Sequence, residues 1–129
     1  MKICIVAANY YPKISKELLI GASKILKKNG IKNYKKIFAP GIFEIPVIIA
    51  KNINSYDAFV ALGCVIKGKT PHFDFISKTT FESIMYMSIN YKKPIGNGIL
   101  ACLNKRQALK RLDKGAEASS AVEQVFINE

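Results

Sequence analysis

Strand-like and helix-like patterns alternate along the whole of this chain of 129 residues. Apolar runs typical of strands cover residues 2–8, 34–38, 58–66 and 95–100. Helical patterns cover residues 15–29, a short segment after Gly41, residues 72–89 and residues 105–129, with a break at 113–115. Because strands separated by helices are joined by right-handed crossovers, the chain is predicted to form an α/β fold with a four-stranded parallel sheet and helices on both faces. The absence of linkers and repeats predicts one domain over residues 1–129.

The three cysteines, Cys4, Cys64 and Cys102, have no metal-binding spacing and lie in apolar, strand-like runs. They are therefore predicted to be reduced thiols in the core, as is usual in the cytoplasm. No apolar run is long enough for a membrane span, and the apolar start of the chain is too short for a signal peptide. A soluble, cytoplasmic protein without a metal site is expected.

The formal net charge of +11 is compatible with nucleic-acid binding, because lysines attract phosphate backbones. However, the basic residues are spread over the whole chain, and only Arg106 and Arg111 carry a guanidinium group. Such a dispersed charge supports weak, salt-dependent association, so no specific nucleic-acid partner is predicted.

Residues 63–74 hold the greatest concentration of reactive side chains, including two ammonium groups, a hydroxyl, a carboxylate and the only histidine, His72. They follow the strand-like run 58–66, and ligands of parallel sheets bind beyond the carboxyl ends of the strands. The residues expected at the ends of the other strands are Tyr10, the segment 41–44 and Asn97. Core packing is the alternative role for the aromatic side chains among them, Tyr10 and Phe43.

Residues 63–70 also match the phosphate-loop pattern of nucleotide hydrolases, a glycine followed by four residues and Gly-Lys-Thr. A phosphate loop needs a flexible backbone, whereas Cys64, Val65 and Ile66 favour an extended strand. The chain also lacks a later apolar run that ends in an aspartate for magnesium. Nucleotide hydrolysis is therefore kept only as a disfavoured alternative.

Four motifs show that the chain resembles the lumazine synthase family, and the resemblance spans nearly its whole length. They are residues 40–46 (PGIFEIP), 63–74 (GCVIKGKTPHFD), 94–100 (PIGNGIL) and 114–118 (KGAEA). The resemblance implies a flavodoxin-like three-layer sandwich. It also implies condensation of 5-amino-6-ribitylaminouracil with 3,4-dihydroxy-2-butanone 4-phosphate in riboflavin biosynthesis, without a cofactor.

The resemblance also implies roles for individual residues on the pyrimidine side of the site. Tyr10 matches the aromatic residue that stacks on the pyrimidine, and Val65 and Ile66 border the ring. The segment that holds the ribityl chain is matched by Ile42, Phe43 and Glu44.

On the phosphate side, the residues that match the family's phosphate site are Gly68, Lys69 and Thr70, and Lys67 before them is a further substrate-binding candidate. His72 matches the proton-transfer residue. Arg111, from a neighbouring subunit, and Lys114 match residues near the phosphate.

The chain departs from the family pattern at several of these positions. Asn97 replaces a second aromatic residue, Ile42 a small residue and Lys67 an arginine, while Arg111 and Lys114 are separated by only two residues. The chain starts at its first strand, without the preceding segment of members that form sixty-subunit capsids, so the resemblance predicts a homopentamer. Riboflavin synthase is an expected partner. A noncatalytic flavin- or pterin-binding relative on the same scaffold stays open as an alternative.

Overall fold

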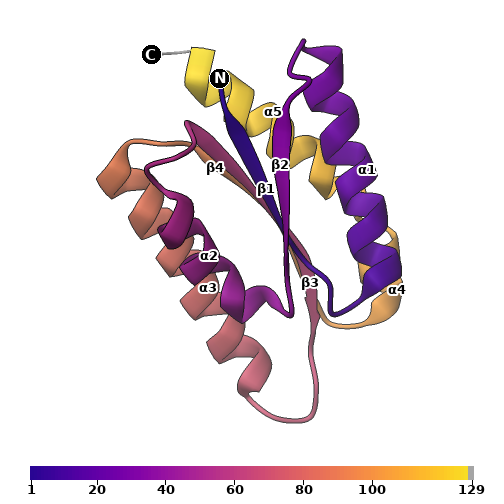
Figure 1. Ribbon diagram of the computed structural model, residues 1–129. Helices are drawn as coiled ribbons and strands as arrows, with labels where there is room; N and C mark the ends of the chain where they lie inside the picture. The colour runs from indigo at the N-terminus through magenta and orange to yellow at the C-terminus, as the bar shows by residue number, and fades with distance from the viewer. Residues whose placement is uncertain (128–129) are drawn as a thin grey trace.

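Four parallel strands form the centre of the protein in a computed structural model that describes residues 1–127 (Figure 1). The strands are β1 (Ile3–Ala8), β2 (Tyr34–Ala39), β3 (Ala58–Ile66) and β4 (Ile95–Cys102), in the order β2-β1-β3-β4. Every residue of β1 is buried, as expected for a central strand that helices cover on both faces. The predicted α/β fold with a four-stranded parallel sheet is confirmed.

The helices form two layers, one on each face of the sheet (Figure 1). One layer contains α1 (Pro12–Lys28), α4 (Lys105–Leu109) and α5 (Lys114–Ile127). The other layer contains the 3₁₀ helix η1 (Ile42–Glu44), α2 (Ile45–Asn52) and α3 (His72–Tyr91). The protein is therefore a three-layer sandwich with a hydrophobic core on each side of the sheet.

Several helix boundaries differ from the prediction, and two of the differences are larger than one residue at the start of a helix. Helix α1 begins at Pro12 rather than at residue 15, because proline suits the first turn of a helix, where its missing N–H is not needed. The break in the C-terminal helical region lies at residues 110–113 rather than 113–115, and Lys114 already starts α5. The last two residues of the predicted helix, 128–129, lie outside the described part of the chain.

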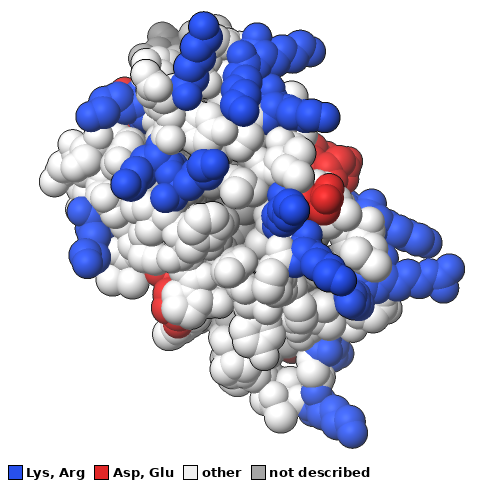
Figure 2. Space-filling model, turned by 45° about the vertical axis from the view of Figure 1, so that its right-hand side comes forward, with Lys and Arg blue, Asp and Glu red and all other residues white. Residues whose placement is uncertain are grey.

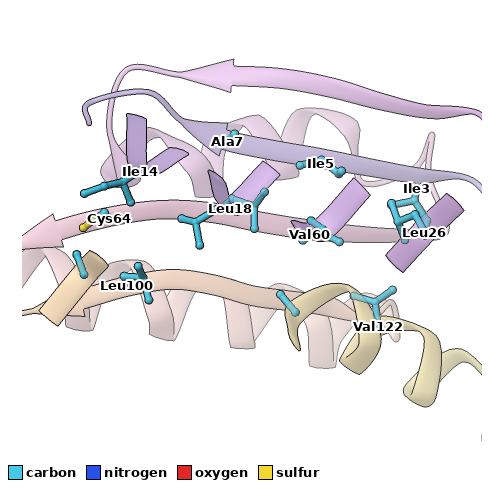
Figure 3. Packing of buried hydrophobic residues seen from close by; sticks show 14 of the residues in the cluster. Ile3, Ile5, Ala7, Ile14, Leu18, Leu26, Val60, Cys64, Leu100 and Val122 are labelled. Carbon is cyan, nitrogen blue, oxygen red and sulfur yellow. The ribbon is translucent and has the colours of Figure 1, made fainter. Parts of the chain in front are cut away.

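Close packing fixes α5 against the sheet and against α1. A Cβ atom at Gly115 would lie 2.1 Å from the carbonyl oxygen of Leu18, and one at Gly96 would lie 2.3 Å from that of Ala118. Figure 3 shows Val122 of α5 in the same core as Leu18 and side chains of β1, β3 and β4. The glycines thus permit backbone contacts that a larger residue would prevent.

The predicted state of the cysteines is confirmed, because all three thiols are free and buried. Lys and Arg side chains are dispersed over the face shown in Figure 2, with uncharged surface between them. Among residues 1–127, no helix combines the length and the hydropathy that a membrane crossing requires.

Candidate functional site

A pocket of about 410 Å³ lies at the carboxyl ends of β1 and β3. These two strands are neighbours in the sheet, and the chain leaves them toward opposite edges, which makes their junction the point where ligands of such folds usually bind. The pocket is lined by residues from four segments: Tyr10, Tyr11, Gly41, Ile42, Phe43, Glu44, Cys64, Val65, Ile66, His72 and Ile76.

Tyr10 occupies the connection from β1 to α1, which three hydrogen bonds hold in place. Asn9 N–H donates to the Ala39 carbonyl at 2.8 Å, and Ser15 N–H donates to the Tyr11 carbonyl at 2.9 Å. The Ser15 hydroxyl donates to the Ala8 carbonyl. The Tyr10 side chain is nevertheless 70% exposed. Core packing, the alternative role for this aromatic residue, is therefore wrong.

Helix η1 and Gly41 before it form another part of the wall of the pocket. The Glu44 carboxylate accepts a hydrogen bond from Gly41 N–H at 3.0 Å, which closes the turn that starts the helix. Ile42 is buried, and its Cγ2 atom would lie 2.9 Å from a Cβ atom at Gly63 of β3. Phe43 is 58% exposed, so it too is a surface aromatic residue rather than a core one.

The end of β3 forms the floor of the pocket through Cys64, Val65 and Ile66. The first part of the apparent phosphate loop is regular strand, because Gly63 pairs with Ile99 and Ile66 pairs with Cys102 of β4. A backbone in a strand ladder cannot curl its N–H groups around two phosphates. The structure thus contradicts the phosphate-loop interpretation of residues 63–70.

The loop from Lys67 to Pro71 connects β3 to α3 and extends beyond the sheet at the lower end of Figure 1. Its side chains are exposed. The loop lies between two lining residues in the sequence, Ile66 and His72, but it is not itself part of the lining. His72 is the first residue of α3 and lines the pocket, and its N–H donates to the Thr70 hydroxyl at 3.4 Å. The loop therefore places exposed lysine side chains and a threonine hydroxyl immediately before His72 in the chain.

Besides the residues of this loop, three further predicted site residues, Asn97, Arg111 and Lys114, do not line the pocket of their own chain. Asn97 pairs with Ala61 in the middle of β3 rather than lying at the carboxyl end of β4, and its Oδ1 accepts a hydrogen bond from Ile99 N–H at 3.0 Å. The expectation that Asn97 lies at that edge of the sheet is wrong, because the register of β4 places it earlier. It is exposed on an edge strand.

Arg111 lies in the turn between α4 and α5, where its N–H donates to the Ala108 carbonyl and its carbonyl accepts from Lys114 N–H, both at 3.0 Å. Burial raises the pKa of the Cys102 thiol, and the positive charge of Arg111 partly opposes this increase. Arg111 is thus placed near the carboxyl end of β4, in the layer of α1, α4 and α5. Lys114 starts α5 in the same layer.

Comparison with known proteins connects this architecture with one family. The sequence model of the 6,7-dimethyl-8-ribityllumazine synthase family matches residues 1–127. A protein of that name from Renibacterium salmoninarum is 37% identical, over 94% of this chain and 84% of its own length. Those from Cutibacterium acnes and Bartonella bacilliformis are 39% and 42% identical, over 94% and 88% of this chain and 77% and 76% of their own lengths. The chain belongs to the 6,7-dimethyl-8-ribityllumazine synthase family. The resemblance that its motifs indicated is confirmed.

Members of the lumazine synthase family are transferases of riboflavin biosynthesis that act on small molecules and assemble into oligomers. Segments that identify the family also form the pocket. Two of the motifs that carried the resemblance, residues 40–46 and 63–74, supply most of its lining.

The pocket also contains three residues that were not predicted from the sequence: Tyr11, Cys64 and Ile76. Ile76 could have been found, because it follows His72 by one helical turn. Cys64 lies at the floor, where burial, reinforced by Cys102, raises the pKa of its thiol to about 12. A thiol with so high a pKa remains protonated near neutral pH and is a poor nucleophile.

Metal binding is not indicated by the geometry. Within residues 1–127, His, Cys, Asp and Glu side chains do not form a group of three or more that could hold a metal ion.

Proposed function

We propose that the pocket is a lumazine synthase active site, in which 5-amino-6-ribitylaminouracil condenses with 3,4-dihydroxy-2-butanone 4-phosphate. The observation that carries this proposal is the single pocket that contains an exposed aromatic ring, the polar turn of η1 and His72. The exposed loop that precedes His72 adds cationic side chains beside it. A flat ring, a polyhydroxyl chain and a phosphate each have a complementary surface there.

The pyrimidine ring of the first substrate binds between Tyr10 and the end of β3. The exposed face of Tyr10 is free for stacking, and the backbone and side chains of Val65 and Ile66 border the ring. Helix η1 (Ile42–Glu44) holds the ribityl chain, whose hydroxyl groups can bond with backbone groups and with the half-buried Glu44 carboxylate.

The phosphate of the second substrate binds at the loop before α3. Lys67 and Lys69 supply positive charge, Thr70 supplies a hydroxyl donor, and Gly68 allows the backbone to approach closely. The loop ends at the amino terminus of a 20-residue helix, where the helix dipole favours an anion.

His72 transfers protons during the condensation. The amino group of the uracil attacks the ketone and water leaves to form an imine, phosphate is then eliminated, and ring closure releases a second water molecule. Each of these steps moves protons, and the imidazole of histidine can accept and donate them near neutral pH. Holding the two reactants together supplies much of the remaining acceleration, as much as about 7 to 11 kcal/mol in well-oriented systems.

The active site is shared between subunits of a homopentamer. Asn97, Arg111 and Lys114 do not line the pocket of their own chain, which supports their contribution to the pocket of a neighbour. An apolar groove of about 500 Å³ between α2 and α3, lined by Val47 and Tyr86 among others, offers a surface for that neighbour. Heterologous contacts of this kind close into a ring when the rotation between subunits is fivefold.

The pentamer works in the cytoplasm, where reduced, buried cysteines are usual, and riboflavin synthase is its partner in the pathway.

A direct test is the absorbance change that accompanies lumazine formation when the purified protein receives both substrates. Product formation supports the proposal, whereas binding of a flavin or pterin without product would identify a noncatalytic relative. Hydrolysis of ATP with magnesium under the same conditions would instead indicate a nucleotide hydrolase.

Subunit sharing has its own test, in which two inactive variants are mixed. His72→Ala and Arg111→Ala subunits should recover part of the activity after exchange, because some interfaces then pair an intact His72 with an intact Arg111. No recovery despite proven exchange would place the whole site in one chain. The mass of the particle in solution separately distinguishes a pentamer from a larger assembly.

A further inference from the structure

Tyr11 lies beside the stacking residue Tyr10 in the wall of the pocket. The centroids of the two rings are 5.0 Å apart, and the ring planes meet at 76°, an edge-to-face arrangement that aromatic pairs favour. Tyr10 is 70% exposed, so few other atoms restrain its ring. The contact with Tyr11 is therefore well placed to control the direction in which the Tyr10 ring points.

Tyr11 is itself firmly held by the fold. Its side chain is partly buried and packs against the core between the sheet and α1. Its backbone precedes Pro12, which restricts it to extended conformations, and its carbonyl accepts the Ser15 N–H at 2.9 Å. The hydroxyl of Ser15 in turn donates to the carbonyl of Ala8 at the end of β1. An anchored ring thus contacts an exposed one.

We infer that Tyr11 is a positioning residue, which holds the Tyr10 ring ready to stack on the pyrimidine substrate. This inference rests on the proposed function and adds a residue to it. Ordering an exposed aromatic side chain before the substrate arrives lowers the entropy lost on binding. The predicted effect is on affinity for 5-amino-6-ribitylaminouracil, because Tyr11 contacts Tyr10 in the wall of the pocket, whereas the phosphate loop is not part of the lining.

The test compares Tyr11→Leu with Tyr11→Phe, a matched control that keeps the ring. We expect Tyr11→Leu to weaken the Kd for 5-amino-6-ribitylaminouracil, measured by calorimetry without the second substrate, by roughly three- to tenfold. Tyr11→Phe should stay within about twofold of the parent protein, because the ring contact remains. The kcat and the KM for the butanone phosphate should change by less than about twofold in both variants.

A second comparison separates positioning from a general structural effect. On a Tyr10→Ala background, Tyr11→Leu should have no further effect on the Kd, because the ring that Tyr11 orients is gone. The inference is wrong if Tyr11→Leu leaves the Kd unchanged, if its effect persists without the Tyr10 ring, or if Tyr11→Phe weakens binding equally. If Tyr11→Leu does not assemble, Tyr11→Met replaces it.

The same measurements keep this inference distinct from the proposed function. A parent protein that binds 5-amino-6-ribitylaminouracil but forms no lumazine would contradict the proposed activity, and the Kd series would still decide the role of Tyr11. A parent protein that does not bind this compound would overturn the inference as well.

Discussion

Gly63 and Gly68 belong to one short segment of the sequence, but they lie in opposite environments. Gly63 is buried in β3, where a Cβ atom would lie 2.9 Å from both Ala8 Cβ and Ile42 Cγ2. Gly68 is exposed in the following loop, and a Cβ atom there would have no neighbour within 4 Å. The strand half of the segment, residues 63–66, contains the residues that form the floor of the pocket. The loop half, residues 67–71, carries exposed lysine side chains and a hydroxyl group.

This division explains how one segment can serve both fold and function. Residues of the strand half are restrained by their pairing with β4, so a substitution there acts on packing and stability. Residues of the loop half are exposed, so a substitution there acts on the substrate with little effect on the fold. The predictions that follow test this division, in order of decreasing effect.

The largest effect is expected at His72, where the loop half meets α3. Replacing it with alanine should reduce kcat by roughly ten- to ten-thousand-fold, because the reaction loses its general acid and base. Steady-state kinetics with both substrates measures the change, and thermal unfolding should show no loss of stability, since the side chain is exposed. An unchanged kcat would remove His72 from the mechanism.

Lys69 should affect the binding of one substrate only. Lys69→Ala is expected to raise the KM for the butanone phosphate by roughly ten- to hundredfold, the scale of a hydrogen bond to a charged group. The KM for the pyrimidine should not change. Lys78→Ala, which removes an exposed lysine on α3 beyond the loop, is the control. Equal effects of the two variants would indicate that general positive charge, rather than a phosphate site, is responsible.

The two glycines allow the most direct comparison. Gly63→Ala should lower the free energy of unfolding by about 1 to 3 kcal/mol, because the added methyl group must displace well-packed atoms. Gly68→Ala should change it by less than about 0.5 kcal/mol, as is usual for exposed sites. Denaturant unfolding of both variants measures the difference. Equal stabilities would show that the packing around Gly63 is looser than the structure indicates.

Features of the fold and the pocket that follow directly from the parallel sheet were predicted correctly from the sequence. The bounds of β3 were predicted correctly, because helices cover both faces of this strand and its residues form one apolar run. Tyr10, Ile42 and His72 meet in one pocket because they follow the carboxyl ends of adjacent parallel strands. Local pattern and topology therefore contain most of the information on the pocket.

Tertiary packing determined the features that the sequence analysis missed. The neighbour of Asn97 across the sheet, Ala61, depends on the register between β4 and β3, and no local pattern in the sequence specifies that register. The first turn of α5 places Gly115 against the backbone of Leu18, a residue almost a hundred positions away, and this contact is not visible in the local pattern. Tyr11 was missed for a similar reason, since its contact with Tyr10 depends on the bend that leads into α1.

The smallest effect is expected at Glu123 of α5, whose charge is buried, in contrast to the exposed charges of the loop half. Asn29 Nδ2 donates to Glu123 Oε2, but Oε1 has no hydrogen-bond partner within the described residues. Burial raises the pKa of this carboxyl above its ordinary value of 4.5, and the hydrogen bond from Asn29 opposes the increase only in part.

Because the folded protein holds this proton more tightly than the unfolded chain does, the free energy of unfolding should fall as the pH rises above about 4.5 and level off above the raised pKa. Glu123→Gln keeps an oxygen for Asn29 and removes the charge, so it should be more stable than the parent by about 1 kcal/mol at pH 7, with the advantage lost below about pH 4. Melting temperatures across this range measure the effect. Lumazine formation should be unchanged, because Glu123 does not line the pocket. A variant that is no more stable at pH 7, or one that loses activity, would show that this carboxylate is partnered or coupled to the site.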